Sequence, residues 1–242
     1  MKLRENCRYD LATVSSMGVR ITPFNRQPVQ SSSLFEMQST SAETNVLNIS
    51  ASLGLDTLVM TRFVQDSAIA SFIKAELRKR NIGYTGPDIP QGGPWGYRHQ
   101  FNIADSGYGL RGPVVQNDRA GEVGRTISAS DFDLERLFTK DGVRILHLSG
   151  LIAAMSESTT AACLEIARYA KANGTLISFD LNYRASFWKG REDALRRDFQ
   201  EIASLADVLI GNEEDFQLAL GVEGPEAGGK GIADKLDGFK GM

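Results

Sequence analysis

Apolar positions in the second half of the chain alternate between short continuous runs and longer stretches of helical period. Residues 143–148 form an apolar run that predicts a buried strand, and residues 156–173 predict a helix that Asn173-Gly174 would end. A strand, a helix, a strand and a helix follow in the same way, at residues 175–179, 191–205, 208–211 and about 213–220. Strands and helices that alternate at this spacing predict a parallel sheet with right-handed crossovers.

The first half of the chain shows the same pattern once and then departs from it twice. Residues 57–64 predict a strand, and residues 67–80 predict an amphipathic helix with its apolar side chains on one stripe. Residues 18–43 carry two prolines and a run of serines, and residues 87–126 are rich in glycine and aromatic residues without helical period. Both segments predict short strands and loops, which would form a small sheet projecting from the α/β part.

The composition is that of a soluble globular protein. The chain has 242 residues, of which 42% are hydrophobic and 24% are charged. Its net charge of −3, from 27 basic and 30 acidic side chains, provides no global positive field for nucleic acid or for an anionic membrane. The longest apolar stretch, residues 146–155, is about half of the roughly 20 residues that span a bilayer.

The N-terminus and the cysteines agree with a cytoplasmic protein. The first residues, MKLRENCRYDL, are charged and lack the apolar region of a signal peptide, so we expect cytoplasmic localisation. Cys7 and Cys163 are far apart and are expected to be free buried thiols. With two cysteines and two histidines in total, a structural zinc site is not expected.

Two glycine motifs match nucleotide-binding patterns only superficially. Residues 107–112 match G-x-G-x-x-G, but Pro113-Val-Val follows instead of a helix, which favours a glycine-rich turn over a dinucleotide site. Residues 224–230 match G-x-x-x-x-G-K, but Gly231 stands where a phosphate-binding loop requires a Ser or Thr hydroxyl for magnesium. A surface connection is the better interpretation of this second segment.

Polar side chains follow two successive predicted strands. Asp180, Asn182 and Arg184 come after one strand, and Asn212 and Asp215 come after the next. The carboxyl ends of parallel strands are where open α/β sheets bind ligands, and a guanidinium can bind a carboxylate or phosphate in bidentate fashion. Acidic residues that open a helix are also ordinary capping chemistry, so both interpretations of residues 212–215 stay open.

Together these segments resemble the ribokinase-like (PfkB) carbohydrate kinases, and most closely the branch of 2-keto-3-deoxygluconate kinase (2-dehydro-3-deoxygluconokinase). Asp-Leu-Asn-Tyr-Arg at 180–184 is similar to that branch's D-x-N-x-R signature, and Asn-Glu-Glu-Asp at 212–215 is similar to the family's N-x-x-E motif. Weaker matches are Ala-Glu-Thr-Asn at 42–45, Tyr-Gly-Leu-Arg at 108–111, Asp-Arg-Ala-Gly at 118–121 and His-Leu-Ser-Gly at 147–150.

The resemblance implies a fold and a reaction. The fold class would be α/β: one domain over residues 1–242, with a three-layer α/β/α Rossmann-like body and a small β-sheet lid from about 18–43 and 90–126. The reaction would be ATP-dependent phosphorylation of a sugar acid such as 2-keto-3-deoxygluconate, with Mg²⁺, the substrate lying between lid and body. A homodimer would be one assembly of such a protein, and neither nucleic acid nor membrane is an expected partner.

The resemblance also assigns roles to residues. The substrate would be bound by five residues: Asn45, Tyr108, Arg111, Arg119 and Arg184. The nucleotide would be bound at the strand ends by Asp180, Asn182, Arg184, Asn212 and Asp215. Of these, Asn212 and Asp215 would reach magnesium through water, and no residue is expected to ligate the metal directly.

Several positions depart from the family pattern. The family's catalytic base and glycine-rich anion hole are expected beyond Met242, so the resemblance implies missing C-terminal strands and helices and an inactive fragment. Thr40-Ser41 replace a Gly-Gly pair, Ser15-Ser16 replace Gly-Glu, and Glu122 replaces a small or hydroxylated residue. A catalytically silent sugar-binding or regulatory protein, and a nucleoside-type or other sugar kinase, therefore remain as alternatives.

Overall fold

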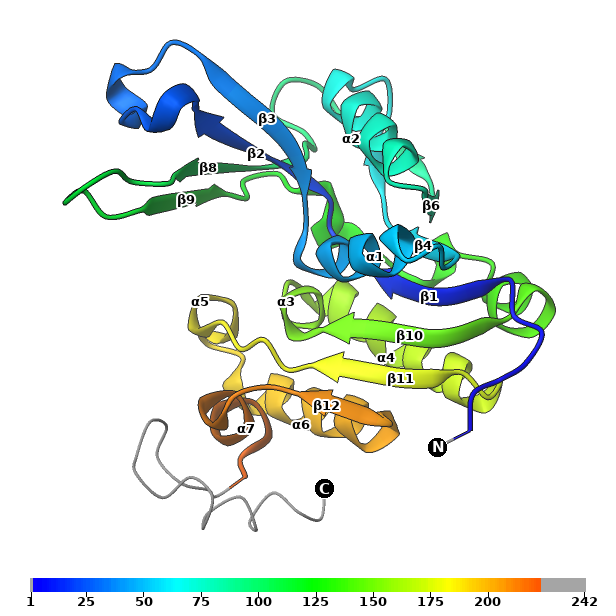
Figure 1. The fold of residues 1–242 in the computed structure, drawn as a ribbon. Helices are drawn as coiled ribbons and strands as arrows, with labels where there is room; N and C mark the ends of the chain where they lie inside the picture. The colour runs from blue at the N-terminus through cyan, green and yellow to red at the C-terminus, as the bar shows by residue number, and fades with distance from the viewer. Residues whose placement is uncertain (1, 223–242) are drawn as a thin grey trace. The chain divides into compact units, whose positions relative to one another are not determined.

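The computed structural model of the protein describes residues 2–222, which fold into two compact units. The first unit combines the N-terminal residues through Val14 with the residues from Ser128 onward, and the second unit runs from Ser15 to Ile127 (Figure 1). The polypeptide thus leaves the first unit after its first strand and returns to it more than a hundred residues later.

The first unit is built on parallel strands. Strands β12 (Val208–Ile210), β11 (Leu176–Asp180), β10 (Val143–Ser149) and β1 (Tyr9–Val14) lie in that order, and each pairs with its neighbour in parallel (Figure 1). Leu146, Leu148, Ile177 and Phe179 are fully buried, as expected for strands that are covered by helices. The predicted parallel sheet is confirmed.

Helices flank these strands, and the three longest of these α-helices lie where the apolar pattern predicts them. They are α3 (Gly150–Ala153), α4 (Glu157–Ala172), α5 (Ala185–Trp188), α6 (Glu192–Leu205) and α7 (Glu213–Leu220), with the 3₁₀ turn η4 (Ala129–Asp131) and the π-helix η5 (Glu135–Asp141). Ser156 caps α4, because its Oγ accepts a hydrogen bond from the Thr159 N–H at 3.2 Å. In the core, the Phe199 ring packs on Phe179 and Trp188 at centroid distances of 5.3 and 4.8 Å.

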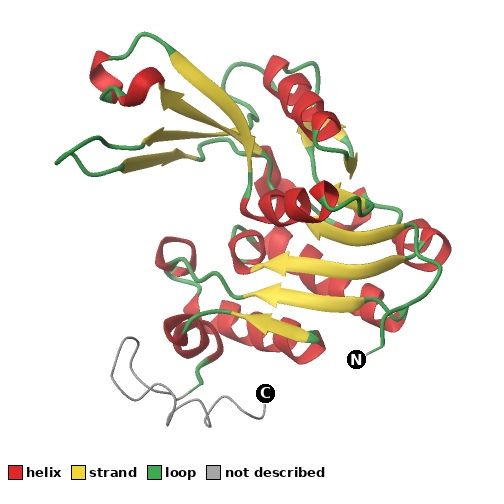
Figure 2. Cartoon of the chain, in the orientation of Figure 1, coloured by secondary structure: helices red, strands yellow, loops and turns green. Residues whose placement is uncertain are grey.

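The second unit contains a mixed sheet with the order β3-β2-β8-β9 (Figure 2). Its strands are β2 (Gly18–Pro23), β3 (Phe35–Thr40), β8 (Gln100–Asp105) and β9 (Val114–Asp118), and two 3₁₀ turns, η1 (Phe24–Arg26) and η2 (Val29–Ser31), join β2 to β3. β2 pairs with β8 in parallel, whereas β3 and β9 are antiparallel to their neighbours. The two proline- and glycine-rich segments therefore form the small sheet that their composition predicts.

The rest of the second unit corrects one expectation. It consists of α1 (Ala42–Ser52), β4 (Thr57–Met60), β5 (Phe63–Val64), α2 (Ala68–Lys79), β6 (Ile82–Thr85), β7 (Asp88–Ile89) and η3 (Val123–Thr126). The single strand predicted at 57–64 is two strands, because β4 pairs with β6 and β5 pairs with β7. Pro87 lies between β6 and β7 and has no N–H to continue the ladder, so the pairing breaks there.

The structure also tests the expectations about one glycine motif and the two cysteines. Residues 107–112 form the tip of the β8–β9 hairpin, where the Tyr108 N–H bonds the Arg111 carbonyl at 3.0 Å, so the glycine-rich turn is confirmed. The segment 224–230 lies outside the described residues. Cys163 is buried, as expected, whereas Cys7 is only half-buried. Within residues 2–222, no helix is long and apolar enough to cross a membrane.

Candidate active site

The ends of three neighbouring strands in the first unit are joined by side-chain hydrogen bonds. Ser149 ends β10, and its Oγ accepts from the Asn182 Nδ2 at 3.2 Å, just beyond the end of β11. The backbone N–H of Tyr183 donates to Asp215 Oδ1 at 3.1 Å, on the helix that follows β12. The residues that the sequence predicts at two separate strand ends are thus brought together, and Ser149 joins them.

The Asn182 turn depends on an unusual backbone conformation. Asn182 has φ of 35°, and asparagine tolerates the left-handed region better than most residues. The turn crosses close to the start of α3, because a Cβ added at Gly150 would lie 1.9 Å from the Leu181 carbonyl oxygen. Gly150 therefore allows the two loops to approach, and the approach places the Asn182 amide beside Ser149.

Asp180 is the carboxylate at the end of β11. Burial raises its pKa, and the neighbouring negative charge of Asp215 raises it further, while the backbone N–H of Asn182 and the charge of Arg184 act in the opposite direction. A buried carboxylate with a second carboxylate beside it favours a cation nearby. This electrostatic environment suits a magnesium ion or a basic side chain.

Asn212 and Asp215 form a capping box at the start of α7. The Asp215 N–H donates to Asn212 Oδ1 at 2.8 Å, and the Asn212 N–H donates to Asp215 Oδ2 at 3.0 Å. The structural interpretation of these residues is therefore confirmed. Each of these oxygens retains a second lone pair for water, so the same atoms can also order a hydrated ion.

The side chains at these strand ends offer two carboxylates and an amide to a hydrated metal ion. Among residues 2–222, no group of three or more His, Cys, Asp or Glu side chains could hold a metal ion. Magnesium dehydrates reluctantly and is commonly bound through one or two carboxylates, its waters and substrate phosphates. The pair Asp180 and Asp215, with the amide of Asn212, matches that mode of binding.

Arg184 lies at the exposed edge of this cluster. It precedes α5, and its Nη1 donates to the Tyr183 carbonyl at 2.9 Å. The four-residue helix that follows is anchored by Trp188, which is buried against Tyr183 at a centroid distance of 5.0 Å. The guanidinium is therefore held near the strand end and faces solvent, where an anionic ligand can reach it.

A second cluster lies in the second unit, around Arg119. Arg119 Nη1 donates to both carboxylate oxygens of Glu122, at 2.8 and 3.0 Å, and Ser16 Oγ donates to Glu122 Oε1 at 2.5 Å. The Arg119 side chain is 20% exposed, whereas that of Glu122 is fully buried. The sequence alone indicated Arg119 as a ligand, but it did not indicate that Arg119 contacts Glu122. In the sequence, Glu122 and Ser16 appear as two separate departures from the family pattern.

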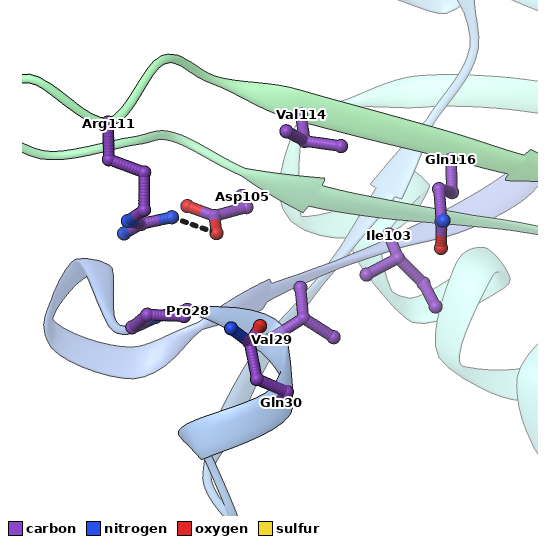
Figure 3. A pocket seen from close by; sticks show the side chains of 8 residues that line it. All are labelled: Pro28, Val29, Gln30, Ile103, Asp105, Arg111, Val114 and Gln116. Carbon is purple, nitrogen blue, oxygen red and sulfur yellow. Dashed lines mark hydrogen bonds and ion pairs between the residues drawn. The ribbon is translucent and has the colours of Figure 1, made fainter.

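Two other predicted substrate ligands, Arg111 and Tyr108, lie at the tip of the β8–β9 hairpin. Arg111 forms an ion pair with Asp105 (Figure 3). Its Nη2 donates to the Arg26 carbonyl at 2.7 Å. The N–H of Gly107 and the charge of Arg111 hold the pKa of Asp105 below its usual range. Tyr108 is exposed at the same hairpin tip.

Strand β9, about 14 Å long at the usual rise per residue, separates this tip from Arg119. Asn45 is exposed on α1. The structure of the second unit therefore does not bring Arg111 and Arg119 together. Their shared role in binding one sugar remains a prediction.

The tip of the hairpin has its own small pocket. A cavity of about 430 Å³ lies between η2 and the strands β8 and β9 (Figure 3). It is lined by Pro28, Val29, Gln30, Ile103, Asp105, Arg111, Val114 and Gln116. The Arg111–Asp105 pair closes one end of it, so this arginine supports the hairpin through a neutral ion pair.

Comparison with known proteins finds sequence similarity to carbohydrate kinases. Residues 128–239 match the sequence model of the pfkB family carbohydrate kinase. The 2-dehydro-3-deoxygalactonokinase of Haloferax volcanii is 24% identical over 89% of this chain and 64% of its own length. The 2-dehydro-3-deoxygluconokinase of Thermoproteus tenax is 26% identical over 82% of this chain and 58% of its own length. The chain therefore spans less than two thirds of these relatives.

Solved structures show the same fold. The 2-dehydro-3-deoxygluconokinase of Thermotoga maritima superposes with a TM-score of 0.78 at 24% identity, covering 93% of this chain and 66% of that one. An uncharacterized sugar kinase of Pyrococcus horikoshii in complex with ATP superposes with a TM-score of 0.70 at 17% identity, covering 86% and 65%. The fold is thus the ribokinase-like α/β fold, and the match to the pfkB family of carbohydrate kinases extends over residues 128–239, slightly less than half of the chain.

Proposed function

We propose that the protein carrying this chain phosphorylates a sugar acid, such as 2-keto-3-deoxygluconate, with ATP as the phosphoryl donor. The observation that carries the proposal is the hydrogen-bonded cluster at the ends of β10, β11 and β12. It joins Ser149 to Asn182 and Tyr183 to Asp215, beside the exposed guanidinium of Arg184. The relatives named as kinases of 2-dehydro-3-deoxy sugar acids support the choice of substrate class.

Phosphoryl transfer requires positioning and charge neutralisation more than covalent chemistry by the protein. In our proposal, Asn182 and Arg184 bind nucleotide phosphate oxygens, and Asp180, Asn212 and Asp215 hold the water shell of a magnesium ion. When bound, magnesium would neutralise the charge of the phosphates. Arg119 in the second unit would bind the carboxylate of the sugar acid, because a guanidinium offers two parallel donors to a carboxylate.

One departure from the family pattern has a structural explanation that is compatible with this function. Ser41 replaces a glycine before α1, and its Oγ accepts from the Thr44 N–H at 3.0 Å as the N-cap of that helix. The side chain is 5% exposed. The hydroxyl is therefore used by the fold, and the substitution does not by itself favour a silent sugar-binding protein over a kinase.

The direct test is a coupled assay of ADP release with ATP, magnesium and 2-keto-3-deoxygluconate, with mass spectrometry of the sugar product. We expect a product heavier by one phosphoryl group, and no ADP release above background without the sugar. ADP release with a nucleoside but not with the sugar acid would contradict the proposal. Binding of the sugar acid without turnover in the complete protein would favour a sugar-binding or regulatory role.

A further inference from the structure

Glu122 is a buried carboxylate whose negative charge is fully engaged by two neighbours. Arg119 Nη1 bonds both of its oxygens, at 2.8 and 3.0 Å, and Ser16 Oγ bonds Oε1 at 2.5 Å. A buried charge is tolerated only when it is paired and hydrogen-bonded, and these three bonds meet that requirement. The three side chains therefore act as one connected group.

Ser16 is also held in place by residues other than Glu122. A Cβ at Gly124 would lie 1.9 Å from the Ser16 Oγ, so the glycine makes the space that the hydroxyl occupies. The next residue, Met17, accepts a hydrogen bond at 2.9 Å from His99 Nδ1, while His99 Nε2 accepts from the Val64 N–H at 3.2 Å. Ser16 therefore has a fixed position against which Glu122 is oriented.

The loop that carries Arg119 and Glu122 is also anchored. The Arg98 N–H donates to the Gly121 carbonyl at 2.8 Å, and the Val123 N–H donates to the Arg98 carbonyl at 2.9 Å. Arg98 Nε donates to the Ala120 carbonyl at 2.6 Å. Both the backbone and the buried carboxylate beside Arg119 are thus fixed before any ligand binds.

We propose that Glu122 is a positioning residue that presents the Arg119 guanidinium to the carboxylate of the sugar acid. The proposal rests on the function proposed above, in which Arg119 is the carboxylate ligand. Glu122 binds one terminal nitrogen of a planar group with five donors, so the plane of the guanidinium is set by the buried Ser16–Glu122 pair. A side chain that is already ordered loses less entropy when the substrate binds, which increases affinity.

A competing role for Glu122 predicts the opposite effect on affinity. Glu122 could simply neutralise Arg119, in which case removing its charge would strengthen the binding of an anionic sugar. Positioning requires that removing it weakens binding. The sign of the change in the dissociation constant therefore separates the two roles.

The experiment removes one hydrogen-bonding partner at a time. The dissociation constant for 2-keto-3-deoxygluconate is measured by calorimetry for the wild type, Glu122→Ser, Glu122→Gln and Ser16→Ala, with circular dichroism melting as the folding control. We expect Glu122→Ser to weaken binding about tenfold. Ser16→Ala should weaken binding less, because Glu122 keeps both of its bonds to Arg119.

Arg119→Ala is the reference variant that separates the two proposals. If Arg119→Ala weakens binding while Glu122→Ser leaves it unchanged or tightens it, the positioning role is overturned and the proposed function stands. If the wild type does not bind the sugar acid, or if Arg119→Ala binds it normally, the assignment of Arg119 and this inference both fail. Should Glu122→Ser not fold, Glu122→Gln decides, because it keeps the volume and removes only the charge. We expect Glu122→Gln to weaken binding, and tighter binding by this variant would overturn the inference.

Discussion

At the scale of single residues, Arg184 is the positively charged side chain that we expect to bind an anionic ligand at the site of the first unit. It is exposed and tied to the protein through one backbone carbonyl, so its removal should disturb ligand binding more than folding. We expect Arg184→Ala to lower kcat/KM for sugar-acid phosphorylation by at least tenfold, which corresponds to about 1.4 kcal/mol. The control is Lys189→Ala, which also removes one exposed positive charge. Equal effects of the two variants would contradict a ligand role for Arg184.

His147 provides a pH-dependent prediction that does not require catalysis. Burial on β10 lowers its pKa from 6.5 to about 4, and its Nδ1 lies 3.2 Å from Ser178 Oγ. Between these two pKa values the unfolded chain binds a proton that the folded protein excludes, so stability is complete above pH 6.5 and is lost as the pH falls toward 4.

The measurement is the free energy of unfolding in denaturant at pH 7 and at pH 5. We expect the wild type to lose about 2 kcal/mol more than His147→Gln between these two values. Burial also lowers the pKa of His99, but that contribution is present in both proteins and cancels in the difference. An equal loss in wild type and variant would show that His147 titrates normally in the folded state.

At the scale of elements, the crossover from β10 to α3 determines where the Asn182 turn can lie. Gly150→Ala would place its Cβ 1.9 Å from the Leu181 carbonyl oxygen and 2.8 Å from Phe199 Cε1. Backbone must move to relieve the first contact, so we expect a loss of about 2–3 kcal/mol in unfolding free energy and weaker nucleotide binding. Gly112→Ala is the control, because nothing lies within 4 Å of its added Cβ. A Gly150→Ala protein as stable as the control would contradict this account.

Most elements could be predicted from the sequence because their apolar periodicity is local. The helix 213–220 and the strand 208–211 were predicted to within a residue, since strands and helices covered on one face have a regular pattern. The strand predicted at 57–64 failed because its break depends on a pairing partner at Pro87, which no local pattern records. The same limit applies to the site: Ser16 and Glu122 are 106 positions apart, so each looked like an isolated departure until the structure placed them in contact.

At the scale of the whole molecule, the proposed ligands should bind to different units of the chain. The nucleotide residues Asn182, Arg184 and Asp215 belong to the first unit, whereas Arg119 and Glu122 belong to the second. The separation follows from the chain's path, which leaves the first unit after β1 and returns at Ser128. We therefore expect each ligand to protect a different set of backbone amides from hydrogen exchange.

Hydrogen exchange measured with each ligand alone tests this separation. We expect ATP with magnesium to slow exchange at residues 149–151, 180–184 and 212–216, where strand ends and the α7 cap would contact phosphate or hydrated metal. A sugar acid should slow exchange within 87–126, with the largest effect near residues 119–123, because Arg119 would be immobilised there. The control ligand is an uncharged keto sugar, which should protect residues 119–123 less than the sugar acid does. No change in 87–126 at saturating sugar acid would contradict the assignment of Arg119. Protection by ATP confined to the second unit would contradict the strand-end site.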